Sequence, residues 1–201
     1  MKKIFLSLVM VIVSITSFSQ TIIKDNEKNN IRTVETTGIT ARSFTDRVVW
    51  NFGLEAHQDL NNKDSIQYIL IVNLNAMTKI PITDNGMFLI KTFNNDIIEL
   101  TNLYNNHNTV TLGYSYHRPI VGNIGTVSAN NIHRNIAYFI INEIQLKSLE
   151  TGVKKVRVET DNGYEEKEYK KDKCGKFLFN SYNIISDYLK TTKSKSIKDD
   201  F

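Results

Sequence analysis

The sequence predicts an α+β fold, in which a largely antiparallel sheet of about eight or nine strands carries two helices. A short helix is expected near 142–151 and a long carboxyl-terminal helix near 173–190, both packed on the sheet. Strand patterns dominate up to residue 141 and both helical patterns come later, unlike the alternating order of a parallel sheet. Residues 31–190 contain no repeat or linker and are expected to form a single domain. An open sheet and a sheet curled toward a partial barrel remain alternatives.

The clearest predicted strand is Val48–His57. Alternate residues of this strand are apolar and include Trp50, the only tryptophan, which is therefore expected to face the core. A first strand is predicted at Ile31–Thr37. Ile66–Asn75 is predicted to pair with Val48–His57 as a hairpin across the polar loop Asp59–Asp64.

Met87–Phe93 and Ile97–Leu103 form the next predicted hairpin. With Asn94–Asp96 as a three-residue loop, Lys91 faces Glu99, whereas a two-residue loop would set an apolar residue against that carboxylate. The three-residue loop is therefore preferred. The residues expected on the core face of this hairpin are Phe88, Ile90, Ile98 and Leu100.

The middle of the chain gives weaker signals. Thr109–His117 is a further strand candidate. Arg118–Asn135 contains two glycines and few apolar residues, so it is predicted to be a long connection. Tyr138–Ile141 is a short apolar run that predicts a strand buried on both faces.

Asn142 is predicted to cap the short helix, and Gln145 three positions later completes a capping-box pattern. The helix is expected to end at Gly152 in a left-handed conformation.

A last hairpin follows the short helix. Val153–Glu159 alternates between apolar and charged residues, and Asn162-Gly163 predicts a two-residue type I′ turn. This turn sets Arg157 opposite Glu168, whereas a three-residue loop would oppose like charges. The return strand Tyr164–Lys170 is so charged that we expect it at a sheet edge.

Asp172 is predicted to cap the long helix. An apolar stripe at helical spacing indicates that one face of this helix docks on the sheet. Its members are Cys174, Phe177, Leu178, Ser181, Ile184, Ile185, Tyr188 and Leu189. Phe179 lies off the stripe and is expected to be covered by the tail or by a neighbouring loop. Cys174, the only cysteine, is interpreted as a small buried residue, so no internal disulfide is expected.

Residues 1–19 have the pattern of a secretory signal peptide. Lys2 and Lys3 precede an apolar run that is too short to span a bilayer, and small residues precede a cleavage site before Gln20. The protein is therefore predicted to be exported, either periplasmic or extracellular, with no membrane span after cleavage. Residues 20–30 are expected to be a mobile leader and 191–201 a disordered tail, because both are polar.

The charge is nearly balanced. The formal net charge of +4 falls to +2 when the two lysines of the signal peptide are removed. Basic residues gather late in the chain with acidic residues among them, which favours a solvated face; contact with an anionic surface is the weaker alternative. Nucleic acid is not expected as a partner of an exported protein, and the partner stays unknown.

No catalytic, cofactor-binding or metal-binding residues are predicted from sequence spacing. The histidines occur in separate segments, without the paired spacing of a zinc site; they are His57, His107, His117 and His133. The loop Asp59–Asp64 lacks the turn glycine and the closing glutamate of a calcium loop. Gly122–Gly125 is glycine-spaced but lacks the lysine of a P-loop.

Three features of the chain carry a resemblance. They are the signal ending in Ser-Phe-Ser-Gln, the strand pair Phe88–Lys91 and Ile97–Leu100, and the run Gly152–Glu159 followed by Lys171–Leu178. Together they resemble small exported proteins of Bacteroidota that have no assigned function. The resemblance implies export and a compact α+β domain, and it implies no catalytic residue.

The leading hypothesis is a non-enzymatic binding or interaction domain, because the predicted scaffold contains no reactive group of residues. One alternative is a hydrolase with a site assembled from distant residues, for which the candidates are Glu55, His57, His117 and His133. Another is a carrier of an apolar ligand in a cavity under the last helix. The loops Asp59–Asp64 and Arg118–Asn135 are the expected places for a working surface.

Overall fold

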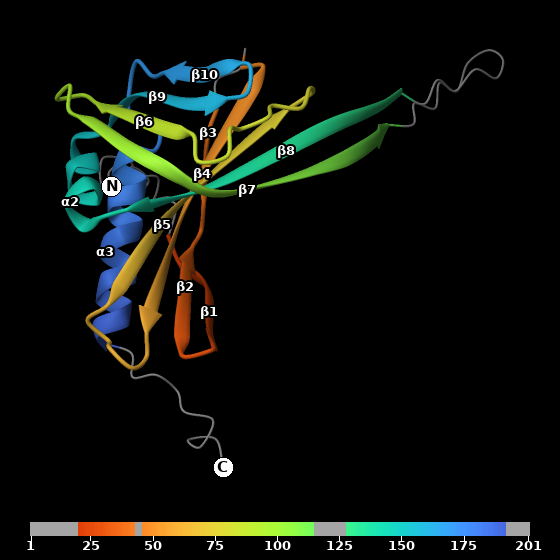
Figure 1. Cartoon of the computed structure of the whole chain (residues 1–201). Helices are drawn as coiled ribbons and strands as arrows, with labels where there is room; N and C mark the ends of the chain where they lie inside the picture. The colour runs from red at the N-terminus through yellow and green to blue at the C-terminus, as the bar shows by residue number, and fades with distance from the viewer. Residues whose placement is uncertain (1–19, 43–45, 115–127, 192–201) are drawn as a thin grey trace, which may run out of the picture.

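The computed structural model describes residues 20–42, 46–114 and 128–191 (Figure 1). It is an α+β fold with a ten-stranded antiparallel sheet, a short helix and a long carboxyl-terminal helix packed on the sheet. The predicted fold class is confirmed, with ten strands in place of eight or nine. The predicted signal peptide and the tail beyond residue 191 lie outside the described residues.

The strands are β1 (Ile22–Lys28), β2 (Ile31–Thr36), β3 (Ile39–Ala41), β4 (Val48–Asp59), β5 (Ile66–Ala76), β6 (Met87–Thr92), β7 (Ile97–Tyr114), β8 (Ser128–Ile141), β9 (Val153–Thr160) and β10 (Gly163–Glu168). The helices are α2 (Glu143–Ser148), the 3₁₀ helix η1 (Leu149–Thr151) and α3 (Gly175–Thr191). The order of strands in the sheet is β1-β2-β4-β5-β8-β7-β6-β9-β10, and β3 pairs with β4 beside this path.

Strand β7 changes its partner part-way along its length. From Asn102 onward it pairs with β8, whereas Ile97–Thr101 pairs with β6. The second half of the sheet therefore folds over the first, and Phe88 of β6 packs between Trp50 of β4 and Phe139 of β8, at ring-centroid distances of 6.4 and 5.0 Å. The sheet is curled but not closed, because β1 and β10, at the two ends of the described order, do not pair.

The core lies between the two halves of the curled sheet and under α3. The predicted core faces of both hairpins are confirmed, since the apolar residues expected there are buried, except Val48, which is half-buried against the core. The buried residues are Trp50, Phe52, Leu54 and Ala56 of β4, and Phe88, Ile90, Ile98 and Leu100 of β6 and β7. From α3, the stripe residues Leu178, Ile185 and Leu189 join the same cluster, together with Cys174 just before the helix, and Phe179 is half-buried against it.

The β6–β7 hairpin has the predicted loop length but starts one residue earlier. Its loop is Phe93–Asn95, closed by a hydrogen bond from Thr92 N to Asp96 O of 3.0 Å, with Asn95 at a left-handed φ of 69°. The predicted pair of Lys91 with Glu99 is therefore wrong, because Leu89 faces Glu99.

The β9–β10 hairpin shows the same displacement. Arg157 faces Glu166, not the predicted Glu168, and the two loop residues are Asp161 and Asn162. The turn is not type I′, since Gly163 alone in it has a positive φ, of 124°. A shift of two residues keeps every side chain on its predicted face, so the buried faces stay as expected. The predicted edge position of the charged return strand is confirmed.

The segment expected to be a mobile leader forms an edge strand instead. Ile22–Lys28 pairs with β2, and the connecting residues Asn29 and Asn30 have φ values of 53° and 61°. Two adjacent asparagines in left-handed conformation form a tight hairpin turn, which the sequence analysis did not recognise.

The long connection predicted for Arg118–Asn135 is wrong over its second half. Residues 128–135 belong to β8 and pair with β7, which runs without interruption from Ile97 to Tyr114. The two strands predicted at Ile97–Leu103 and Thr109–His117 are thus one. Together with β8, β7 leaves the body of the molecule as a ribbon (Figure 1). Residues 115–127, including the glycine-spaced Gly122–Gly125, lie outside the described part.

Both predicted helix caps are confirmed. Asn142 and Gln145 form the capping box of α2, and Gly152 follows η1 at a φ of 86°, although with an extended ψ in place of the left-handed one expected. The Asp172 carboxylate accepts hydrogen bonds from Gly175 N and Lys176 N at 2.8 and 2.9 Å. It also accepts one from Val153 N at 2.9 Å, so a single side chain joins the start of α3 to the start of β9.

Asp172→Ala is expected to lower the free energy of unfolding by about 1–2 kcal/mol, because it removes the cap and the acceptor of Val153 N together. Urea denaturation followed by circular dichroism measures the change. Asp187→Ala, at an exposed position of the same helix, is the control and should stay within about 0.5 kcal/mol of the wild type. Equal losses for the two variants would contradict the role given to Asp172.

Candidate functional site

The structure brings together two of the four hydrolase candidates. Glu55 and His57 share one face of β4, and His57 Nε2 contacts the Glu55 carboxylate. Lys24 Nζ of β1 lies 3.4 Å from Glu55 Oε2, and Glu35 of β2 stands directly opposite Glu55. Lys24 and Glu35 were not among the predicted residues, because they belong to other strands and no sequence spacing joins them to Glu55.

The pKa values of the two carboxylates of this group are shifted in opposite directions. Burial raises the pKa of Glu55, but the hydrogen bond from His57 and the charge of Lys24 outweigh it and hold that pKa below its usual value. Burial, followed by the charge of Glu55, raises the pKa of Glu35. Glu55 therefore already has two partners within the sheet face, which is the arrangement of a structural ion pair network.

His133 lies far from this group. It is on β8, where its ring stacks on His107 of β7 with centroids 5.5 Å apart. In the sheet His133 pairs with Ala76 of β5, and Ala76 pairs with Val48 of β4. Val48 is seven residues from Glu55 along β4, which corresponds to about 23 Å at the rise of a strand. The described candidates thus occupy two places, and His117 lies outside the described residues.

The described residues contain no group of three or more histidine, cysteine, aspartate or glutamate side chains placed to hold a metal ion. In the loop Asp59–Asp64, Asp59 Oδ1 accepts a hydrogen bond from Asn61 N at 2.8 Å and so stabilises the turn itself. Beneath α3, where a carrier would need its cavity, side chains of the helix join the hydrophobic core. Tyr182 packs edge-on against Tyr68 there, with centroids 5.2 Å apart.

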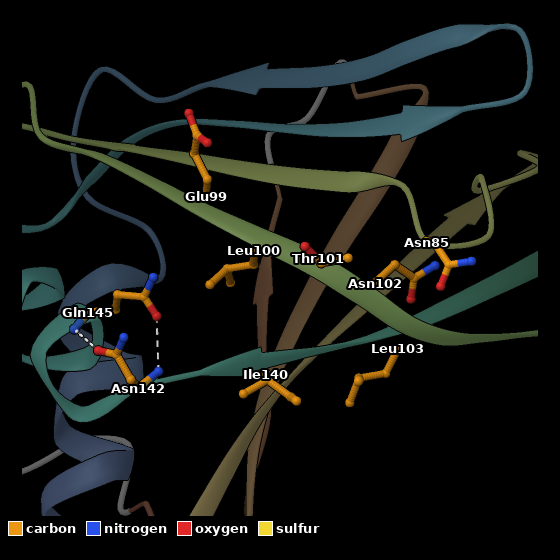
Figure 2. A pocket seen from close by; sticks show the side chains of 9 residues that line it. All are labelled: Asn85, Glu99, Leu100, Thr101, Asn102, Leu103, Ile140, Asn142 and Gln145. Atoms are coloured by element: carbon orange, nitrogen blue, oxygen red, sulfur yellow. Dashed lines mark hydrogen bonds between the residues drawn. The ribbon is translucent and has the colours of Figure 1, made fainter.

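A surface cleft of about 430 Å³ opens where β7 leaves β8 (Figure 2). One wall is β7 before the point of separation, and the other is the end of β8 with the first residues of the α2 capping box. The lining residues are Asn85, Glu99, Leu100, Thr101, Asn102, Leu103, Ile140, Asn142 and Gln145. This size is within the usual range of ligand sites.

Hydrogen bonds of Asn102 fix β7 at the point where β7 and β8 separate. Its backbone N donates to Gly86 O at 2.9 Å, and its side-chain Nδ2 donates to Thr83 O at 3.1 Å and to Asn105 Oδ1. The Asn102 side chain is buried, and its Oδ1 has no hydrogen-bond partner in the described part of the chain. The cleft therefore contains a buried acceptor on a side chain that the corner of β7 fixes in place.

The main chain of β7 presents a free edge to this cleft. Thr92 N bonds to Asp96 O, and Asn102 N bonds to Gly86 O, so the even-numbered residues of this part of β7 make the hydrogen bonds to β6. Because backbone groups alternate between the two sides of a strand, the N–H and C=O groups of Ile97, Glu99 and Thr101 point away from β6. The described pairing of β8 begins at Asn102. Because the backbone groups of Asn102 point to β6, this pair uses the Thr101 C=O, which faces Ile140 of β8. The C=O and N–H groups of Ile97 and Glu99 and the N–H of Thr101 therefore have no neighbouring strand.

The two strands at the ends of the sheet order differ from this edge. β1 and β10 end the strand order, and both are highly charged, as expected for edges that resist pairing with another chain. The β7 edge has one charged residue, Glu99, between Ile97 and Thr101. Ile97, Leu103 and Ile140 around it are 63%, 43% and 42% exposed. This edge thus carries less charge than the edges formed by β1 and β10.

No protein-family model, no curated protein and no solved structure matches the chain. The resemblance to small exported proteins therefore stays a prediction. Within the part of the chain that the structure describes, no helix has the length and apolar character needed to cross a membrane.

Hydrogen exchange should reveal the free edge. The amides of Ile97, Glu99 and Thr101 are expected to exchange rapidly, while those of Ile98 and Leu100 between them are protected by the β6 ladder. Two-dimensional NMR in D₂O measures each amide separately. Protection of Glu99 N–H as strong as that of Leu100 N–H would contradict a free edge.

Proposed function

We propose that the protein is an exported, non-enzymatic binding domain that takes up an extended peptide segment of a partner protein along the free edge of β7. The observation that supports this proposal most directly is the row of outward-facing backbone groups at Ile97, Glu99 and Thr101 beside the cleft. An added strand provides complementary N–H and C=O groups at the same two-residue spacing, a known mode of peptide recognition.

The energetics fit a moderate affinity. The three outward-facing residues offer three N–H donors and two C=O acceptors, those of Ile97 and Glu99, and each hydrogen bond formed contributes about 1 kcal/mol net. Apolar contact with Leu103 and Ile140, which are partly exposed in the cleft, adds to this. Ordering the peptide opposes both contributions. Micromolar dissociation constants are therefore expected for short peptides.

The sequence supports export. Lys2 and Lys3, the apolar run after them and the small residues before Gln20 form a signal-peptide pattern. Intact mass spectrometry of the protein recovered from its own cells should give a chain that begins at Gln20. A chain that retains residues 1–19 would contradict export by cleavage.

Thr101→Pro is expected to weaken peptide binding at least about ten-fold, because proline removes the outward N–H and places its ring where the added strand would lie. The fold should be retained, since the N–H of Thr101 makes no bond to β6 in the observed register. Thr101→Ala, which keeps the N–H, is the matched control and should bind nearly as well as the wild type.

The probe for this test is a displayed library of random ten-residue peptides, and selected sequences are then measured as free peptides by fluorescence polarisation. Peptides N-methylated at alternate positions should lose binding in one phase of the alternation and keep it in the other. If the library gives no ligand, or if Thr101→Pro binds the selected peptides as well as Thr101→Ala, strand addition is not the function of this edge.

A further inference from the structure

We infer that the extended segment carries a lysine or arginine opposite Glu99, with an apolar residue on each side of it. This inference rests on the proposed function and specifies the chemistry of the partner. The cleft supplies the apolar contacts, and the one charged residue on the free edge selects the charge.

Glu99 lacks a cross-strand cation. Its neighbour on β6 is Leu89, and the next residue in that row, Arg157 of β9, is bonded to Glu166 of β10 at 2.6 Å. Lys91 is opposite Ile97, one pair further along the ladder. Among the described residues no ion pair involves Glu99, and its side chain is exposed. Its carboxylate is therefore available to a residue on the open side of β7.

The alternation of a strand fixes which residues of the segment meet which wall. In an antiparallel addition, the orientation of every described strand pair, the residue opposite Glu99 projects to the same face as Glu99. Figure 2 shows the Glu99 side chain directed away from the side of β7 that carries Leu100. The flanking residues of the segment project to the opposite face, beside the buried apolar side chains of Ile98 and Leu100, whereas the exposed Ile140 lies on the face of Glu99. An apolar, basic, apolar sequence is thus complementary to the edge.

The same carboxylate disfavours a second copy of the chain as the occupant. Two β7 edges paired in the register that uses all three outward-facing residues would set Glu99 opposite Glu99 of the second copy. Like charges directly opposite one another are destabilising. A basic segment from another protein removes this conflict and adds an attraction.

Three heptapeptides with blocked ends test the charge preference. They are Ser-Thr-Val-Lys-Val-Thr-Ser and the same sequence with glutamine or glutamate in place of lysine. The lysine peptide should bind about three- to ten-fold more tightly than the glutamate peptide, with the glutamine peptide between them, as measured by fluorescence polarisation. The ratio should fall as salt is added, because the pair is exposed.

Glu99→Lys should reverse the order, so that the glutamate peptide binds best. Glu168→Lys, at an exposed position on the edge strand β10, makes the same change in net charge away from the cleft and should leave the order unchanged. Melting curves of both variants show that the fold is kept.

The outcomes separate this inference from the proposed function. Equal binding of the three peptides, an order that Glu99→Lys does not reverse, or no binding of any of the three overturns the charge preference. A library that nevertheless yields ligands sensitive to Thr101→Pro leaves strand addition standing. Ligands selected without enrichment of lysine or arginine also overturn the inference. Concentration-dependent dimers of the wild type would identify a second copy as the occupant and overturn it as well.

Discussion

The structure depends on one strand serving two partners. The first part of β7 pairs with β6, and the rest of β7, from Asn102 onward, pairs with β8. At Asn102 the pairing passes from one to the other, which turns the sheet over itself and brings Phe88 onto Trp50 and Phe139. Burial of these aromatic rings stabilises the curled sheet. The free backbone edge before Asn102 is the geometric consequence of the same change.

The remaining elements secure this arrangement and protect its outer edges. Asp172 joins the start of α3 to β9, and the close approach leaves no space for a side chain at Gly175, where a Cβ would lie 2.6 Å from Val153 N. At the two ends of the sheet, charged residues make β1 and β10 poor partners for another chain. The edge of β7 lacks this dense charge. An incoming strand is therefore repelled less at this edge than at β1 or β10.

Reactive side chains do not mark this site. The group around Glu55 contains carboxylates, a lysine and a histidine, but they are paired with one another on a sheet face. The proposed site works through main-chain groups, which every residue has, and its specificity rests on Glu99 and on a few apolar side chains. Such a site is defined by which strand is missing from a position, and this information is absent from any sequence pattern.

The sequence by itself determined the local structure. The capping box of Asn142 and Gln145, the Asp172 cap, the buried faces of the hairpins and the late position of both helices follow from short-range periodicity and hydrogen bonding, which act within a few residues. Register was decided in three dimensions, because a shift of two residues preserves every alternation while it changes every partner. In the observed register Glu99 is opposite Leu89, and the predicted partner, Lys91, is opposite Ile97. The strand β1 and the outer part of β8 are polar, so only backbone pairing reveals them. The exchange of partners at Asn102, and with it the cleft, follows from which strands meet across the fold.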